Sequence, residues 1–81
     1  MMDRNREISM LARLEQICSN FVSEGYRRTG KMGAVRALKH PNGNRITLIG
    51  TENDIGIIKN GRLVKREPIT VHAADGDAAR P

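Results

Sequence analysis

The chain has 81 residues, of which 38% are hydrophobic and 28% charged, and a formal net charge of +5. A chain of this length holds one small domain, which buries only about 60% of the surface that its unfolded chain exposes. No stretch approaches the roughly 18 apolar residues of a membrane-spanning helix, and the start lacks the apolar run of a secretion signal. We therefore expect a single cytoplasmic domain and exclude a membrane protein.

The first predicted element is an amphipathic helix. Asp3 or Asn5 can cap its start, and Gly25 stands where a left-handed residue would end it. Cys18 lies in its apolar stripe and, as the only cysteine, is expected to fill the core rather than form a disulfide or a metal site. The apolar residues recur every three or four positions, as on one helix face: Ile8, Leu11, Leu14, Cys18, Phe21 and Val22, widened by Met10 and Ile17.

Short segments of strand-like composition follow the helix. They are Ala34 to Lys39, Arg45 to Ile49 and Ile55 to Ile58. The sequence Asn42-Gly43 between the first two predicts a tight hairpin, because these residues supply the positive φ angles that such turns require. A second Asn-Gly pair, Asn60-Gly61, predicts another hairpin and a fourth strand at Arg62 to Lys65.

Together these elements predict an α+β fold, with one N-terminal helix packed on a three- to four-stranded antiparallel sheet. Residues 1–66 form the single domain. Residues 67–81 are expected to be a flexible tail, because they offer little apolar surface to offset the entropy of ordering. Extension of an edge strand by Ile69 and Val71 is left open, and Ala73 to Pro81 is expected to be disordered. One helix covers one face of the sheet, so we expect Arg36, Lys39, Arg45 or Thr47 to project toward solvent on the other.

Positive charge is concentrated in the middle of the chain. Arg27 to Lys31 is predicted to be a flexible basic loop, which can follow a phosphate backbone, and the hairpin would bring further cations into the same patch. Base stacking is not supported, because Tyr26 is the only aromatic residue near these cations. The residues between Gly25 and Gly50 include no acid, and the cations there are the predicted nucleic-acid-binding residues: Arg27, Arg28, Lys31, Arg36, Lys39 and Arg45.

Nothing in the sequence predicts catalysis. His40 precedes Pro41 in a turn and is interpreted as a solvated or turn-stabilising residue rather than a general base, and His72 falls in the predicted tail. The chain has no serine-histidine-acid arrangement, no paired carboxylates at an interpretable spacing, no phosphate-binding glycine loop and no zinc-ligand spacing. We expect no catalytic residue, no metal and no cofactor.

One stretch resembles a known family. The helix ending in Gly25-Tyr26, then Lys31-Met32-Gly33, His40-Pro41-Asn42-Gly43 and the strand Arg45 to Ile49, is similar to the HicA toxins. These are small mRNA interferases with a fold related to the double-stranded-RNA-binding domain. The resemblance covers roughly Leu11 to Ile49 and implies a related fold and an RNA-binding surface. The family's catalytic histidine has no counterpart, because Val35 or a neighbour stands in its place, and Asp54 to Val64 replaces the second helix by strands.

Three functions remain open on the sequence. The first is a non-catalytic nucleic-acid-binding protein that contacts phosphates, with regulation as one role open to it. The second is a protein-interaction module or inhibitor that docks on an acidic surface of a larger protein. The third is a HicA-like ribonuclease with His40 in a displaced role. The kind of nucleic acid and the oligomeric state are left open.

Overall fold

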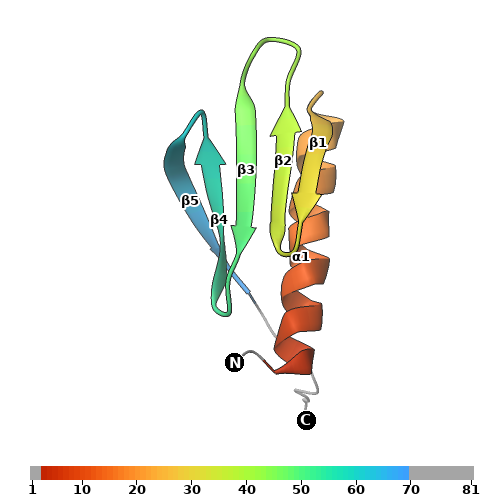
Figure 1. Ribbon diagram of the computed structural model, residues 1–81, viewed down its shortest axis with the longest axis vertical. Coiled ribbons are helices and arrows are strands. Elements are labelled where there is room, and N and C mark those ends of the chain that lie inside the picture. The colour runs from red at the N-terminus through yellow and green to blue at the C-terminus, as the bar shows by residue number, and fades with distance from the viewer. Residues whose placement is uncertain (1–2, 70–81) are drawn as a thin grey trace.

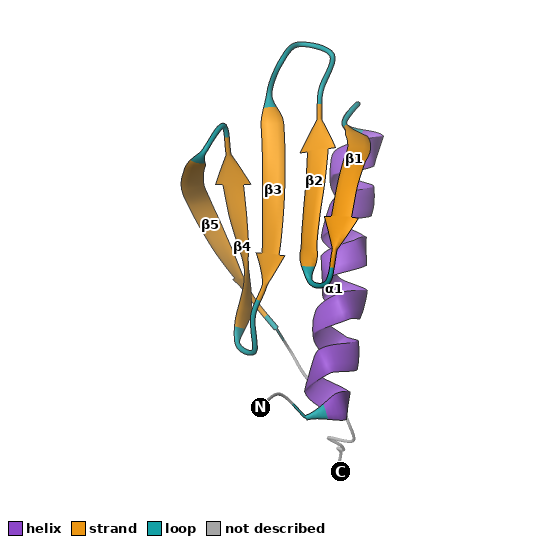
Figure 2. Ribbon diagram, viewed as in Figure 1, coloured by secondary structure: helices purple, strands orange, loops and turns teal. Residues whose placement is uncertain are grey.

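A computed structural model describes residues 3–69. One helix, α1 (Arg4–Ser23), precedes five strands: β1 (Arg27–Met32), β2 (Val35–Lys39), β3 (Arg45–Gly50), β4 (Asp54–Lys59) and β5 (Arg62–Pro68). The strands form one antiparallel sheet in chain order, and α1 lies behind it in Figures 1 and 2. The predicted α+β class is confirmed, but the sheet has five strands rather than three or four.

Helix α1 begins at a capping aspartate. The Asp3 side chain accepts a hydrogen bond from the Arg6 backbone N–H at 2.9 Å, which satisfies a donor that has no partner within the helix. Of the predicted stripe, Ile8 and Val22 are instead 56% and 41% exposed. The seam against the sheet is therefore narrower than the sequence predicts. Met10, Leu14, Ile17 and Cys18 are buried in it, and the half-buried Leu11 and Phe21 pack against it.

The helix ends where the sequence predicts. Gly25 has a φ of +102°, and its backbone N–H donates to the Val22 carbonyl at 3.0 Å. An added Cβ at this position would lie 2.7 Å from His40 Nε2. Gly25 is thus required both for its backbone conformation and for the close approach of the β2–β3 turn.

Replacing Gly25 by alanine is expected to lower the free energy of unfolding by about 1–3 kcal/mol for the positive φ, and by more for the contact with His40. Gly33→Ala is the matched control, because Gly33 also has a positive φ, of 55°, but nothing lies within 4 Å of an added Cβ. Urea denaturation of both variants measures the difference. Equal losses would contradict a close contact between Gly25 and His40.

Strand β1 is the element that the sequence interpretation missed. The predicted flexible loop from Arg27 to Lys31 is an edge strand paired along its length with β2, from Arg27 opposite Lys39 to Met32 opposite Val35. All of its residues are exposed, so the alternation of apolar and polar residues that reveals a half-buried strand is absent. A bulge between Arg28 and Gly30 shifts the register, as is common on edge strands.

Both predicted hairpin turns are confirmed. In the β2–β3 turn Gly43 has a φ of +99°, and its N–H donates to the His40 carbonyl at 2.9 Å. In the β4–β5 turn Asn60 and Gly61 both have positive φ, of 52° and 83°, as a type I′ turn requires. The predicted fourth strand, Arg62 to Lys65, is the first part of β5. It pairs with β4 from Lys59 opposite Arg62 to Asp54 opposite Pro68 and forms a long hairpin at the edge of the sheet.

The core lies between α1 and one face of the sheet. Leu14, Leu38, Leu48 and Ile55 are fully buried there, and Cys18 joins them as predicted. Burial raises the pKa of the Cys18 thiol, so this cysteine is an inert core residue. We call the sheet face toward α1 the inner face and the opposite one the outer face.

The folded part extends past the predicted boundary at residue 66. Strand β5 continues through Pro68, and the Ile69 N–H donates to the Asn53 carbonyl at 3.2 Å while its side chain packs against the core. The predicted disordered tail, from residue 70 onward, lies outside the described residues. No helix within residues 3–69 is long and apolar enough to cross a membrane.

Candidate nucleic-acid interface

The structure divides the six predicted binding residues between the two faces of the sheet. Side chains alternate along a strand, so residues in register with each other share a face. Arg27, Lys39 and Arg45 lie on the outer face, whereas Arg28, Lys31 and Arg36 lie on the inner face near the β1 edge. The single patch expected from the sequence is therefore wrong.

The three outer cations form one row at the end of the sheet. Arg27 is opposite Lys39 in the β1–β2 ladder, and Lys39 is opposite Arg45 in the β2–β3 ladder. All three are exposed. Within residues 3–69, no ion pair or side-chain hydrogen bond involves their charged groups. We call Arg27, Lys39 and Arg45 the cation row.

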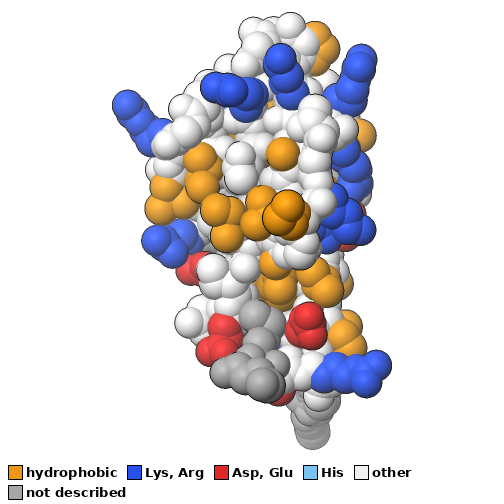
Figure 3. Space-filling view, viewed as in Figure 1, with side chains coloured by type: hydrophobic (Ala, Val, Ile, Leu, Met, Phe, Trp, Pro, Cys, Tyr) orange, Lys and Arg blue, Asp and Glu red, His pale blue; other side chains and the backbone are white. Residues whose placement is uncertain are grey.

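Like charges placed directly opposite each other destabilise a sheet, so the cation row costs stability that a bound anion would recover. The row borders a hollow of about 340 Å³ lined by Arg27, Thr29, Lys39, His40 and Pro41. Basic side chains also stand along this end of the molecule in Figure 3, whereas acidic ones gather toward the other end. An unneutralised row beside an open hollow is suited to anionic oxygens.

The two turns at this end hold the row in place. The Asn60 Oδ1 accepts a hydrogen bond from the Arg45 backbone N–H at 2.8 Å, and the Asn60 Nδ2 donates to Asn44 Oδ1 at 3.2 Å. These bonds tie the β4–β5 turn to the start of β3. The backbone that carries Arg45 is therefore fixed before any ligand binds.

His40 serves the turn rather than the row. Its Nδ1 accepts a hydrogen bond from the Asn42 backbone N–H at 3.1 Å, and its ring packs edge to face on Tyr26, with ring centroids 5.0 Å apart. Tyr26 in turn packs on Phe21. The rings of Tyr26 and His40 are therefore both held by packing contacts. The hydrogen bond from Asn42 agrees with the turn-stabilising role that the sequence predicts for His40.

Arg36 does not project toward solvent as predicted. It is 6% exposed, because residues two apart share a face and Leu38 must point into the core. Its Nε donates to Glu15 Oε2 at 2.7 Å, and its Nη1 donates to the Gly33 and Val35 carbonyls at 2.6 and 3.0 Å. Glu15 also accepts from Arg28 Nη1 at 2.7 Å. Arg28 and Arg36 therefore hold α1 against β1 and β2.

The two guanidinium groups, Arg36 first and then Arg28, hold the pKa of Glu15 below its ordinary value of 4.5. The unfolded chain then binds the proton more tightly, so this cluster stabilises the fold above about pH 4.5 and loses that contribution as the pH falls through the folded-state pKa. Lys65 and then Arg13 lower the pKa of Glu67 in the same way.

Glu15→Gln is expected to lower the free energy of unfolding at neutral pH and to flatten its fall at acidic pH. Urea denaturation from neutral pH down to about pH 3 measures both effects. Glu52→Gln is the control, since no ion pair among the described residues involves its carboxylate. An unchanged acid slope in Glu15→Gln would show that this carboxylate is not held by the two arginines.

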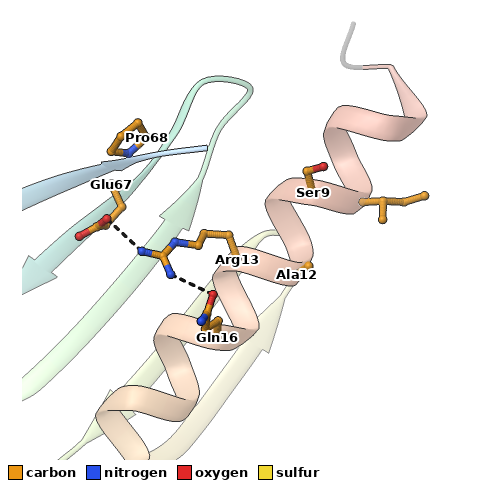
Figure 4. Close-up of a pocket in the computed structure, with 7 residues that line it drawn as sticks. Ser9, Ala12, Arg13, Gln16, Glu67 and Pro68 are labelled. Atoms are coloured by element: carbon orange, nitrogen blue, oxygen red, sulfur yellow. Dashed lines mark hydrogen bonds and ion pairs between the residues drawn. The ribbon is translucent and has the colours of Figure 1, made fainter. Parts of the chain in front are cut away.

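A second hollow, of about 580 Å³, lies between α1 and the end of β5 (Figure 4). The Arg13 Nη2 donates to Glu67 Oε1 at 3.1 Å across it, and the Arg13 Nη1 donates to Gln16 Oε1 at 2.9 Å. These polar groups satisfy one another. Within residues 3–69 no cluster of three histidine, cysteine, aspartate or glutamate side chains is arranged to hold a metal ion.

The sequence held a signal for the arginine–glutamate cluster that was not used. Glu15 interrupts the apolar stripe next to Leu14, on the helix face that meets the sheet, where a carboxylate requires a cationic partner. Predicting the cation row requires knowing that Arg27 lies opposite Lys39, and this follows only from the pairing of β1 with β2. The sequence does not reveal β1 as a strand, because all of its residues are exposed.

No protein-family model, curated protein or solved structure matches the chain.

Proposed function

We propose that the protein is a non-catalytic nucleic-acid-binding protein that contacts the phosphate backbone through the cation row. One observation carries the proposal: three cations stand side by side across β1, β2 and β3, with no acid pairing any of them within residues 3–69. A cytoplasmic location is part of the same proposal.

The spacing of the row supports this choice of ligand. Adjacent strands are about 4.8 Å apart, so the row spans about 10 Å from β1 to β3. Phosphates rise by about 3.4 Å along the axis of each strand of DNA and lie farther apart than this in space, because the strand winds around the axis, so a row of this length spans neighbouring phosphates rather than a single one. Recognition of the backbone rather than the bases also agrees with the packing of Tyr26 against Phe21 and His40.

The test is binding of the purified full chain to labelled double-stranded RNA, double-stranded DNA and single strands at about 50 and 200 mM salt, where contacts to several phosphates lose orders of magnitude in affinity. Binding that weakens steeply with salt supports the proposal. Absence of binding at the lower salt overturns it and favours an acidic protein surface as the ligand of the row. RNA cleavage that disappears in His40→Ala would instead favour a HicA-like ribonuclease.

A further inference from the structure

The outer face of the sheet carries apolar side chains next to the cation row. Met32, Val35 and Ile49 are in register across β1, β2 and β3 and are 80%, 37% and 37% exposed. The adjacent row contains Ile58 and Leu63, and Leu63 is 48% exposed. Figure 3 looks onto this face and shows the apolar side chains as a band across it. We call the two rows the apolar band: Met32, Val35 and Ile49, with Ala37, Thr47, Ile58 and Leu63.

We propose that the apolar band is a self-association surface, on which a second copy of this chain packs face to face. The band reaches from β1 to β5 through the half-buried Ala37, Thr47 and Ile58, with the charged Arg66 opposite Gly56 at its β5 end, so it offers a connected surface rather than isolated exposed residues. Antiparallel sheets commonly bury such a face against another sheet.

The size of the face fits a weak, reversible dimer. Five strands spaced by about 4.8 Å give a width of about 24 Å, and the two rows of the band, four residues along a strand, give a length of about 13 Å, or on the order of 300 Å² for each copy. Two such bands bury on the order of 600 Å². This area is below the lower limit of about 1,200 Å² for stable specific interfaces, so the association is expected to be weak and to need high protein concentration.

Charge selects how the two copies are oriented. The cation row lies at one end of the outer face, and Glu52 lies in the β3–β4 turn at the other end, near Asp54, which pairs with Arg66 of its own copy at 3.6 Å. A two-fold axis running along the strands would place one cation row on the other. An axis in the plane of the sheet that runs across the strands instead places Arg45 of each copy near Glu52 of the other, while the two apolar bands meet.

This arrangement leaves much of the cation row open. Strands β1 and β2 are joined by a turn at Gly33 and Ala34, so they end one row before the β3–β4 turn does. Arg27 and Lys39 of the second copy would extend past that shorter edge into solvent. The dimer would then carry two open pairs of cations at opposite ends, and its formation does not depend on nucleic acid.

The test is sedimentation velocity of the full chain, without nucleic acid, from micromolar to near-millimolar concentration. We expect the mass to rise with concentration from 9.0 kDa toward twice that value. Met32→Glu and Leu63→Glu should each remain monomeric. Ile8→Glu is the matched control, since Ile8 is 56% exposed but lies on α1, on the inner side of the sheet, and it should associate like the wild type.

A wild type that stays monomeric at the highest concentration overturns the proposal, as does association that Met32→Glu and Leu63→Glu leave unchanged. Circular dichroism of these exposed-site variants confirms that they are folded. Arg45→Glu should weaken the dimer, and adding Glu52→Arg should restore it. Failure of that restoration overturns the proposed axis. Because no nucleic acid is present, none of these outcomes bears on the proposed binding function.

Discussion

Replacing Arg27, Lys39 and Arg45 together by alanine is expected to weaken binding to nucleic acid by about two to three orders of magnitude at low salt, if each contacts one phosphate. The loss should be similar for all base sequences, because contacts to phosphates carry no sequence information. The fold should be retained or slightly stabilised, since the three exposed side chains have no charged partner within residues 3–69 and repel one another.

The decisive measurement is the dependence of the binding constant on salt. Each phosphate contact contributes about 0.9 to the slope of log K against log salt on a DNA duplex, so the triple variant should lose about 2.7 from that slope. The matched control replaces Arg4, Lys31 and Arg62 by alanine, which removes the same net charge from exposed side chains that also have no ion pair within residues 3–69 and that lie on α1 or the inner face of the sheet. If both triple variants lose the same affinity, net charge rather than the cation row explains the binding.

The sequence predicts that Arg27, Arg28 and Lys31 act together in one basic loop, because they are close together in the chain. In a strand, however, Arg27 and Arg28 point to opposite faces, and only the first belongs to the cation row. A triple variant of Arg27, Arg28 and Lys31 would therefore combine a binding effect with damage to the contact between α1 and the sheet.

The predicted helix, two turns and four strands rest on patterns that are local in the chain. Apolar periodicity defines α1, and two Asn-Gly pairs define the hairpins because only a few residues adopt positive φ without strain. Strand β1 has no such pattern, since both of its faces are exposed. Its existence depends on hydrogen bonds to β2, which no local window of sequence contains. Of the cation row, the predicted hairpin places Lys39 and Arg45 next to each other, but the position of Arg27 depends on β1.

Replacing Arg36 by alanine is expected to lower the free energy of unfolding by about 2–4 kcal/mol, a large part of the total for a domain this small. The side chain is 6% exposed and donates to Glu15 and to the Gly33 and Val35 carbonyls. Its removal leaves the two carbonyls without this donor, leaves Arg28 as the remaining partner of Glu15, and opens a gap between α1 and β2. The affinity for nucleic acid of the molecules that remain folded should be unchanged.

A double-mutant cycle with Glu15→Gln separates the ion pair from the packing of the arginine. If the two side chains act through each other, the double variant should lose less stability than the sum of the single losses. Glu15 also binds Arg28, so part of its contribution should persist in Arg36→Ala. Loss of affinity in folded Arg36→Ala without loss of stability would reverse the assignment, making Arg36 a binding residue and not a structural one. The structure predicts the opposite, because a guanidinium enclosed by a carboxylate and two carbonyls has little left to offer a phosphate.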